Sequence, residues 1–435
     1  MQPPFLRCPG DCHVARPRFD RHHPVEPRPQ HPGARHVAIV GCGPSGCYTA
    51  LALRRSLPDV HVTIFDVRPT PFGLLRYGVA PDHQGMKNVS RQFDRLFGAE
   101  NVRFVGNVRV GQDLPFATLE EHFDAVVVAT GLAVDRPLAA PTDAGANVVG
   151  AGQLLRLLNG DPDSVLRDTT PSPLGSEVLI VGTGNVAMDV ARLLCKSDEG
   201  FDGSDVDDDA RQALAIDAIE HLTLLSRGPK ERVRWDASMF TELCALPGVT
   251  VYLDGELEPR SAPTDQPTDR TVRVDVRFKE IPTAIDADGQ GTIVRTRFND
   301  DPAASEPDRL GETFTRHVDT VVTAMGFVDA ASDFDHDAHD RVVKVGGCES
   351  GALGNLAENR ALAKVAAQQV ISRLDQTNDS RDGWEGIRDD LPTTAITFDD
   401  WTQIDRAEIE RARPGRVRRK FTAWSDMTDH LARST

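Results

Sequence analysis

Residues 36–46 read His-Val-Ala-Ile-Val-Gly-Cys-Gly-Pro-Ser-Gly, and this stretch decides the fold. Its first five residues are mostly apolar and β-branched, which is typical of a buried strand. The glycines at 41, 43 and 46 then follow the G-x-G-x-x-G spacing. Gly41 allows a tight turn, Gly43 lets the backbone approach a pyrophosphate, and Gly46 lets the next helix pack closely on the strand. Because a helix N-terminus also supplies amide donors and partial positive charge, the stretch predicts a dinucleotide site.

The residues that follow complete a β-α-β unit. A second strand, VHVTIFD, ends at Asp66, which lies 20 residues after Gly46 and suits a ribose hydroxyl group. A third buried run, residues 124–131, closes this first unit. A glycine turn alone is a weak signal, but a strand before it, a helix after it and an acid at this distance together indicate a bound dinucleotide.

A second unit with the same order begins at residues 177–194, EVLIVGTGNVAMDVARLL. Its glycine turn, residues 182–187, is a variant that the dinucleotide fingerprint allows. The next strand, residues 221–226, ends without an acid, and Arg227 follows it. A cation there suits the 2′-phosphate of NADP, although a solvated basic loop is the alternative. We therefore expect FAD in the first unit and NADP in the second, a pairing that moves a hydride onto a flavin and electrons onward.

The composition narrows the class of protein further. The chain has 435 residues, which suits two or three domains, and a formal net charge of −17, which argues against nucleic acid as a partner. No run approaches the roughly 18 apolar residues of a membrane-spanning helix, so membrane insertion is not expected. The seven cysteines are scattered, with no C-x-x-C pair and no four spaced for an iron–sulfur cluster. We therefore expect a cytoplasmic enzyme without a metal or a redox-active disulfide.

The chain divides into a tail and two discontinuous parts. Residues 1–35 are rich in Pro, His and Arg and predict a disordered tail. Residues 36–132 and 325–435 are expected to form the FAD-binding domain, and residues 133–324 the NADP-binding domain. Within the second domain, residues 250–324 alternate short β-rich runs with Pro, Asp and Gly loops, as an antiparallel excursion would. The oligomeric state stays open.

Several longer stretches resemble one family. They are HVAIVGCGPSGCYTALAL, TPFGLLRYGVAPDHQGMKNV at residues 70–89, VGTGNVAMDVARLL, SRGPKER and AITFDDWTQIDRAEIERARPGRVRRKF. Together they resemble the adrenodoxin-reductase type of ferredoxin–NADP reductase, over about residues 36 to 430. The resemblance implies an α/β fold with two Rossmann-like domains in a glutathione-reductase-like architecture. It also implies electron transfer from NADPH through FAD to a ferredoxin-like iron–sulfur carrier.

The resemblance carries a set of cofactor-binding residues. For FAD it implies Gly41, Gly43, Ser45, Gly46, Asp66, Gly73, Leu74, Leu75, Ala129, Thr130, Gly131, Gly346, Gly351, Ala352, Leu353 and Gly354. For the nicotinamide nucleotide it implies Gly182, Gly184, Asn185, Val186 and Arg227.

Three further residues are implied near the reacting rings. In the family, the histidine of the A-P-D-H motif pairs with a glutamate, and these positions fall on His83 and Glu242. Such a pair could relay protons, with the carboxylate orienting the imidazole, or His83 could be a structural histidine. Asp189 matches a family carboxylate near the nicotinamide, although it could equally be an acid that satisfies the helix dipole.

The sequence departs from the family at three places. Ser226 replaces the first of two arginines that hold the 2′-phosphate, and Met239 replaces a glutamate, so NAD(H) is not excluded. Residues 346–354, GGCESGALG, lack the family's tryptophan, lysine and arginine but keep three glycines. These changes leave two alternatives open: a specialised NAD(P)H-dependent flavin oxidoreductase with another acceptor, or a flavin-binding subunit with low turnover. Cys348 in this loop is expected to be a small packed residue rather than a reactive thiol.

Charged stretches suggest where a partner protein could dock. An acidic protein that binds an acidic ferredoxin needs a local basic patch. The candidates are Arg227, Lys230, Arg232, Arg234, Arg411, Arg413, Arg416, Arg418, Arg419 and Lys420. For the residues from Arg411 to Lys420, the alternative is a solvated basic tail. The acidic residues 197–209 are expected to form a solvated surface insertion.

Overall fold

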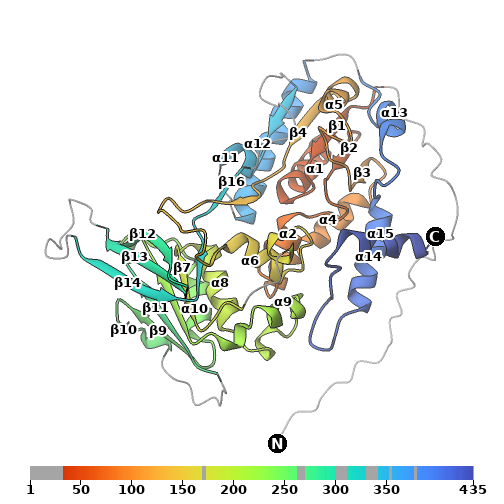
Figure 1. Cartoon of the computed structure of the whole chain (residues 1–435). Coiled ribbons are helices and arrows are strands. Elements are labelled where there is room, and N and C mark those ends of the chain that lie inside the picture. Colours follow the sequence, from red (N-terminus) through yellow and green to blue (C-terminus); the bar gives the residue numbers. More distant parts are fainter. Residues whose placement is uncertain are drawn as a thin grey trace, which may run out of the picture.

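The computed structural model describes residues 33–168, 173–261, 270–289, 291–299, 311–329, 341–351, 355–376 and 380–434. The predicted tail, residues 1–35, therefore lies outside the described residues except for its last three. Figure 1 shows two lobes, each built around a twisted sheet with helices packed on it. No cis peptide bond occurs among the described residues.

The first sheet is parallel and has the strand order β17-β4-β1-β2-β3. Its strands are β1 (His36–Val40), β2 (His61–Phe65), β3 (Val102–Val105), β4 (Ala125–Val128) and β17 (Val342–Lys344). β1 is central and buried along its whole length, as its apolar sequence predicts. β17 joins the sheet beside β4 although more than 200 residues separate them, so the C-terminal third of the chain returns to the first lobe.

The second sheet has the order β10-β9-β11-β8-β7-β15-β6. Its strands are β6 (Val148–Gly150), β7 (Glu177–Val181), β8 (His221–Leu225), β9 (Val249–Leu253), β10 (Glu256–Leu257), β11 (Val272–Arg277) and β15 (Thr320–Thr323). All of its neighbours pair in parallel except β10, which is antiparallel to β9. Both sheets are thus doubly wound α/β structures with two Rossmann-like glycine turns.

The expectation of an antiparallel excursion over residues 250–324 is wrong at both ends of this range, because β15 as well as β9 and β11 pairs in parallel within the second sheet. β9 and β11 extend the parallel sheet, and only β12 (Glu280–Ala287), β13 (Thr292–Phe298) and β14 (Thr313–Val318) form an antiparallel sheet. The reason is that β9 and β11 are buried on one face only, so their side chains alternate between buried and partly exposed positions. That period of two occurs in any half-covered strand, whether parallel or antiparallel.

The helices cover the sheets and connect their strands. They are α1 (Pro44–Ser56), α2 (Leu74–Tyr77), α3 (Gln84–Lys87), α4 (Ser90–Phe97), α5 (Phe116–His122), α6 (Ala151–Leu158), α7 (Val165–Asp168), α8 (Asn185–Cys195), α9 (Asp208–Ala213), α10 (Ala237–Cys244), α11 (Gly347–Ser350), α12 (Leu356–Leu374), α13 (Trp384–Ile387), α14 (Phe398–Glu410) and α15 (Trp424–Ser434). α12 begins at a capping box formed by Asn355 and Glu358. It packs against α1 on the first sheet.

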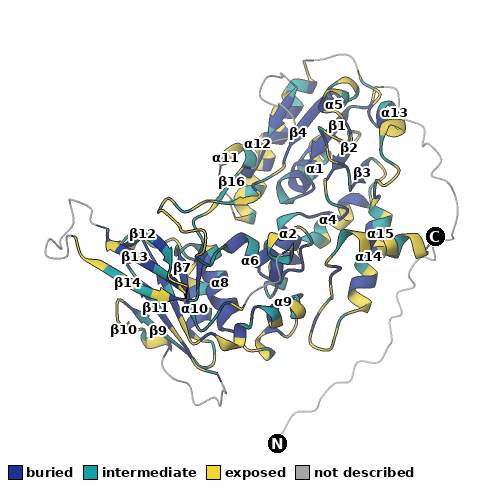
Figure 2. Cartoon of the chain, viewed as in Figure 1, coloured by how far each residue is buried: buried dark blue, intermediate teal, exposed yellow. Residues whose placement is uncertain are grey.

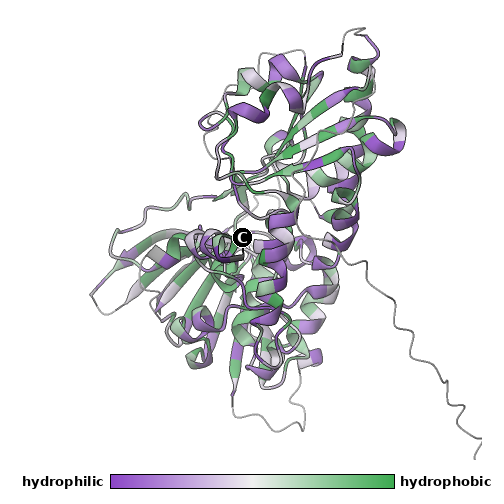
Figure 3. Ribbon diagram, turned by 90° about the vertical axis from the view of Figure 1, so that its right-hand side faces the viewer, coloured by the Kyte–Doolittle hydropathy of each residue, from purple (hydrophilic) through white to green (hydrophobic). Residues whose placement is uncertain are grey.

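Each sheet has its own buried core, which Figure 2 shows as dark strands between partly exposed helices. Hydrophobic side chains concentrate in the strands of both lobes (Figure 3). Trp401, Ile404 and Met427, from α14 and α15, are buried in the core of the first sheet. Burial of their apolar surface is what attaches the C-terminal helices to that lobe.

The chain crosses between the lobes twice, at one place. β5 (Val134–Asp135) on the outward path pairs antiparallel with β16 (Phe327–Val328) on the return path. The Asp135 carboxylate accepts the backbone N–H groups of Gly152 and Gln153 at 2.8 and 3.0 Å. It therefore fixes the first turn of α6 to the crossing, because these amides have no partner inside the helix.

The acidic insertion, residues 197–209, is not the solvated loop that its composition predicts. Phe201 and Val206 are buried in the core of the second sheet, and the insertion leads into α9. Its carboxylates pair with the basic segment, residues 411–420. Arg413 pairs with Asp198 and Asp208, Arg416 with Asp198, Asp202 and Asp208, Arg419 with Asp209, and Lys420 with Asp205.

The basic segment is therefore not a solvated tail, because most of its charges pair with carboxylates, although Arg413 and Arg419 stay 43% and 61% exposed. Its role as a docking patch stays a prediction. The Arg416 side chain is only 1% exposed and lies 2.6 Å from Asp198. Opposite charges on two segments more than 200 residues apart neutralise each other across the two lobes. Composition alone assigns each segment separately to the solvent, because it carries no information on which charges meet.

A buried ion pair of the first lobe gives a stability test. The Arg76 guanidinium donates to both oxygens of Glu408 at 2.6 and 2.7 Å, and both side chains are buried. We expect Arg76→Met to lower the free energy of unfolding by about 3–5 kcal/mol, because it leaves the Glu408 charge buried without its main partner. Chemical denaturation followed by circular dichroism measures the change.

The control is an exposed pair with the same chemistry. Arg388 lies 2.9 Å from Glu385, and both side chains are more than a third exposed. Arg388→Met is expected to cost less than about 1 kcal/mol. Equal effects of the two substitutions would contradict the role given to Arg76.

Candidate functional site

Both glycine turns lie at the carboxyl ends of central parallel strands, β1 and β7. Gly41 has φ +111° and Gly182 has φ +126°, a region that favours glycine. A Cβ atom at Gly41 would lie 2.4 Å from the Ala129 carbonyl oxygen, and one at Gly182 would lie 2.3 Å from that of Ala324. The two turns therefore have the same construction, and each needs glycine at its first position.

The second glycine of each turn faces open space. Gly43 and Gly184 are the N-cap residues of α1 and α8, with extended backbone and φ near −80°. A Cβ atom at either position would meet nothing within 4 Å. The amides of the first helical turn thus open onto space that a phosphate group can enter. This geometry fits the pyrophosphate of a dinucleotide at both turns.

Close packing within the protein stabilises the first glycine turn. A Cβ atom at Gly46 would lie 2.1 Å from the Gly41 carbonyl oxygen, so glycine permits the close packing of α1. Cys42 and Cys47 are both buried, and their sulfur atoms lie 3.8 Å apart. Cys42 precedes the N-cap of α1 and Cys47 is the fourth residue of the helix, two positions whose apolar side chains commonly pack together. Ala187, at the third position of the second turn, is fully buried.

Asp66 lies beside the first turn, at the end of β2. Its carboxylate accepts the backbone N–H groups of Cys42 and Arg68 at 2.7 and 2.9 Å. Burial raises the pKa of Asp66, although these two hydrogen bonds oppose the shift. The residue therefore holds the glycine turn, and its place next to the turn suits the predicted ribose contact, which stays a prediction.

The other residues predicted for FAD come from three segments at the same edge of the sheet. A Cβ atom at Gly73, which precedes Leu74 and Leu75 of α2, would lie 3.2 Å from the Cα atom of Gly43. Ala129, Thr130 and Gly131 follow β4 directly, and Gly131 has φ +73° with open space around its Cα atom.

The third segment contains Gly346 and Gly351. Both have positive φ, and a Cβ atom at Gly346 would collide with the Ser45 side chain. Ser45 donates a hydrogen bond to Asn359 of α12 at 3.1 Å, a residue that the sequence reasoning missed because nothing near it in sequence marks it. Ala352, Leu353 and Gly354 lie outside the described residues. Cys348 is partly buried against the core of the first sheet, as a small packed residue should be.

The residues predicted for the nicotinamide nucleotide lie around the second turn. Asn185 begins α8, Val186 follows it, and the Asn185 side chain accepts the Asp236 N–H at 2.7 Å. β8, which Arg227 follows, is bound to the turn through the Gly182 N–H and the Leu225 carbonyl at 3.0 Å.

Basic side chains gather next to this turn. Among the described residues, no carboxylate forms an ion pair within 4.0 Å with Arg227, Lys230, Arg232 or Arg234, although the charge of Lys230 contributes to lowering the pKa of Glu258. Ser226, where the resemblance leads one to expect another arginine, is buried and bonds to the Gly228 carbonyl at 3.0 Å. The basic group beside the turn therefore has charge available for an anion, and Arg227 is its member nearest to β8.

His83, Asp189 and Glu242 come together, as the resemblance implies. Nδ1 of His83 lies 3.4 Å from Oδ1 of Asp189, and its Nε2 lies 3.9 Å from Oε2 of Glu242. The imidazole thus stands between carboxylates from α8 and α10, on a loop that leads from the first lobe. The contact with Asp189 is the shorter of the two, which the sequence did not indicate.

The two carboxyl groups differ in electrostatics. Interaction with His83, followed by the charges of Arg192 and Lys196, lowers the pKa of Glu242 to about 2. Burial raises the pKa of Asp189, against the effects of His83 and Arg192. Asp82, Arg192 and Lys196, which the sequence reasoning missed, complete this cluster. The only signal for them is the position of Asp82 next to His83 and the helical spacing of Arg192 and Lys196 from Asp189.

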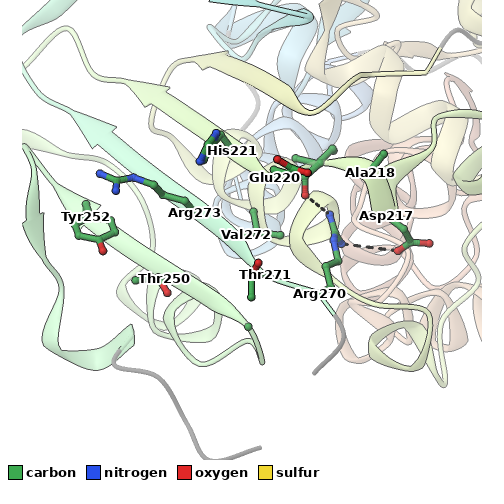
Figure 4. Close-up of a pocket in the computed structure, with 12 residues that line it drawn as sticks. Asp217, Ala218, Glu220, His221, Thr250, Tyr252, Arg270, Thr271, Val272 and Arg273 are labelled. Carbon is green, nitrogen blue, oxygen red and sulfur yellow. Dashed lines mark hydrogen bonds and ion pairs between the residues drawn. The ribbon is translucent and has the colours of Figure 1, made fainter. Parts of the chain in front are cut away.

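Cavities elsewhere do not compete with this site. A cavity of about 440 Å³ opens at the amino ends of β8, β9 and β11 (Figure 4). Its Arg270 is already bonded to backbone carbonyls, and Arg273 lies over the Tyr252 ring at 4.0 Å. In open parallel sheets, ligands bind at the carboxyl ends of strands, which is where the two glycine turns lie.

Two glycine turns with ligand space, joined by a cluster of acids and a histidine, define an oxidoreductase that binds two dinucleotides. Residues 35–242 match the family model described as pyridine nucleotide-disulphide oxidoreductase. The chain is 35% identical over 430 residues to cindoxin reductase from Citrobacter braakii, which covers 92% of each chain. It is 27% identical over 445 residues to the probable mitochondrial NADPH:adrenodoxin oxidoreductase of Schizosaccharomyces pombe, covering 90% of this chain and 94% of that one.

The fold agrees with a solved structure. FprA from Mycobacterium tuberculosis in complex with NADPH superimposes with a TM-score of 0.81, at 24% identity, over 92% of this chain and 100% of that one. The chain belongs to the adrenodoxin-reductase family of ferredoxin–NADP reductases, and it is an oxidoreductase that uses FAD and NADPH. No helix among the described residues is long and apolar enough to cross a membrane.

The two glycines of the second turn give a matched test. Gly182→Ala is expected to lower the free energy of unfolding by about 2 kcal/mol or more, because a Cβ atom there collides with backbone at a positive φ. Gly184→Ala should leave the stability nearly unchanged but weaken NADPH binding about tenfold, since its methyl group enters the space above α8. Thermal unfolding and a direct titration with NADPH measure the two effects. An unchanged affinity in Gly184→Ala would contradict the assignment of this space.

Proposed function

We propose that the chain transfers electrons from NADPH through FAD to a ferredoxin-like iron–sulfur protein. The observation that carries the proposal is that the His83 loop of the first lobe meets α8 and α10 of the second, next to one of two glycine turns. When bound, FAD supplies the ring system that accepts a hydride and releases single electrons. Relatives named for NADPH and for adrenodoxin or ferredoxin support this acceptor class.

We assign the cofactors as the sequence predicts. The first turn with Ser45, Asp66 and Gly346 would hold FAD, and the second turn with Asn185 and Arg227 would hold NADPH. The proposed domains are residues 36–132 and 325–435 for FAD and residues 133–324 for NADP. The strand pairing of β5 with β16 at the crossing supports these limits.

The chain's own residues would act as follows. The amides of α1 and α8 bind the phosphates, and the glycines let the backbone approach them. His83 holds a proton at the junction of the lobes, and the carboxyl groups of Glu242 and Asp189 orient its ring. We also propose a cytoplasmic location, because the described cysteines are all free thiols. They include Cys42 and Cys47, whose sulfur atoms lie close together in space.

The acceptor could also be another electron carrier. In α11, the exposed Glu349 stands in the stretch where the family resemblance leads one to expect basic groups. A carboxylate there disfavours an acidic partner at this edge. The relative named cindoxin reductase supports this second candidate.

A coupled assay decides between the candidates. NADPH-dependent reduction of cytochrome c is measured with and without an acidic [2Fe–2S] ferredoxin. The first proposal predicts a large, salt-sensitive increase when ferredoxin is added. No increase, with the flavin still reduced by NADPH, would favour the other acceptor, and a flavin that NADPH does not reduce would favour the low-turnover subunit.

Arg227 should set the preference for NADPH. We expect Arg227→Ala to lower the ratio of kcat/KM for NADPH to that for NADH by about tenfold or more, because a charge-assisted bond to the 2′-phosphate contributes about 1.5–3 kcal/mol. Arg273→Ala, at the opposite end of the same sheet, is the control and should leave the ratio unchanged. An unaltered ratio in Arg227→Ala would assign the 2′-phosphate to other cations.

His83 should affect hydride transfer rather than binding. His83→Gln is expected to slow anaerobic flavin reduction at saturating NADPH by about 10- to 100-fold, with a nearly unchanged Kd for NADPH. Glu242 has a pKa of about 2, so it stays ionised above about pH 4 and should contribute no step to the rate profile at neutral pH. Reduction kinetics that match the unsubstituted protein would make His83 a structural residue.

A further inference from the structure

One arginine joins all three carboxylates around His83. The Arg192 side chain is fully buried on α8, and it donates to Asp82, Asp189 and Glu242. Its distances are 2.9 Å to Oδ1 of Asp82, 2.9 Å to Oδ1 of Asp189 and 3.0 Å to Oε1 of Glu242. The guanidinium therefore connects the His83 loop, α8 and α10 through one rigid planar group.

The two oxygens of Glu242 have different partners. Oε1 accepts from Arg192 at 3.0 Å and from Lys196 at 3.1 Å. Oε2 is the oxygen that faces Nε2 of His83. Two cations thus hold Oε1, and this arrangement leaves Oε2 to face the imidazole.

The backbone of His83 is fixed by the same group. Asp82 precedes His83 directly, and both of its oxygens bond to Arg192 while one also bonds to Lys196. Burial alone would raise the pKa of Asp82, but the hydrogen bonds and charges of Arg192 and Lys196 lower it to about 2. Asp82 is thus a carboxylate at neutral pH and anchors the loop by charge.

The charges that face His83 come from three elements. They are Asp82 on its own loop, Asp189, Arg192 and Lys196 on α8 and at its end, and Glu242 on α10. Three carboxyl groups and two cations thus surround the ring. A neutral imidazole has one N–H donor and can serve one carboxylate at a time, whereas the protonated ring can serve Asp189 and Glu242 together.

We propose that Arg192 is a positioning residue, which holds the His83 imidazole between Asp189 and Glu242 by binding Asp82, Asp189 and Glu242 at once. The proposal rests on the proposed function for the role of His83 in hydride transfer. The placement of the ring, however, is argued from the hydrogen bonds of Arg192, which Lys196 supplements at Asp82 and Glu242, and it does not depend on that role. Loss of the guanidinium would leave Lys196 alone to hold Asp82 and Glu242 and would remove the Arg192 bond from Asp189, so the loop and Glu242 would be held less firmly.

The test compares three variants. Arg192→Met removes the positive charge and the paired N–H donors of the guanidinium (the fork) while keeping a side chain of similar length. Arg192→Lys keeps the charge but lacks the fork. Arg211→Met is the control, because Arg211 is a buried arginine of the same lobe that pairs with Asp217, outside the cluster. The flavin spectrum and the melting temperature report whether each variant folds.

The first readout does not depend on turnover. Reaction of His83 with diethyl pyrocarbonate is followed over pH 5.5–9 by mass spectrometry of its peptide, in the FAD-loaded protein. We expect the reaction to be at least about threefold faster at high pH in Arg192→Met and in Arg192→Lys, because the ring is no longer held. In Arg192→Met the midpoint should also rise by about one pH unit, since a cation near His83 is lost. Arg211→Met should match the unsubstituted protein.

The second readout is the pH dependence of flavin reduction by NADPH. Arg192→Met should be at least about tenfold slower at pH 7, with its profile moved to higher pH, while Arg192→Lys keeps the original profile at a reduced rate. His83 modification that is the same in all variants would overturn the proposal. If Arg192→Met does not fold, Arg192→Lys decides, because an unchanged modification rate there contradicts positioning by the fork.

The two proposals fail in different ways. Altered His83 reactivity without any effect of His83→Gln on flavin reduction would uphold the positioning by Arg192 and reject the catalytic role of His83. An effect of His83→Gln with unaltered reactivity in the Arg192 variants would do the reverse.

Discussion

Buried charges must be neutralised, and one short stretch of this chain carries three whose partners lie in three distant regions. Arg76 pairs with Glu408 of α14, Asp82 with Arg192 and Lys196 on α8, and Lys87 with Asp205 of the acidic insertion. Neither lobe nor the C-terminal helices can move away from this stretch without exposing or stranding a charge. The relative placement of the two glycine turns depends on that constraint.

The constraint gives a physical meaning to the stretch that resembles the family most specifically, G-L-x-R-x-G-V-A-P-D-H. Arg76 binds Glu408 of α14 and so helps to attach the C-terminal helices to the first sheet. Asp82 serves the junction of the lobes, and His83 is the only member with an environment suited to proton chemistry. Lys420 joins Lys87 on Asp205, so the basic segment closes the same network from the other side. The carboxylates of the acidic insertion pair with the basic segment, whereas the basic side chains at residues 227–234, beside the second glycine turn, form no ion pair with a described carboxylate.

The sequence predicted what local patterns determine. β1, the backbone of both glycine turns and the return of the chain to the first sheet at β17 are found as predicted, because strand composition and glycine spacing report backbone requirements directly. The cofactor contacts of the turns and of Asp66 stay predictions. The network could not be predicted, because its pairs join residues far apart in the chain, such as Arg76 and Glu408 or Asp82 and Arg192. The acidic insertion and basic segment were misread for the same reason. β9 and β11 were misread because alternation reports burial on one face and not strand direction.

The central claim is that the two dinucleotide sites are arranged for hydride transfer in one chain despite the altered loop at residues 346–354. Anaerobic mixing of the FAD-loaded protein with NADPH, followed by the loss of flavin absorbance in a stopped-flow instrument, tests it most directly. The account predicts rapid, complete bleaching by NADPH and slower bleaching by NADH. Slow bleaching by both nucleotides would contradict it, because the turns and the His83 cluster would then be present without forming a working site.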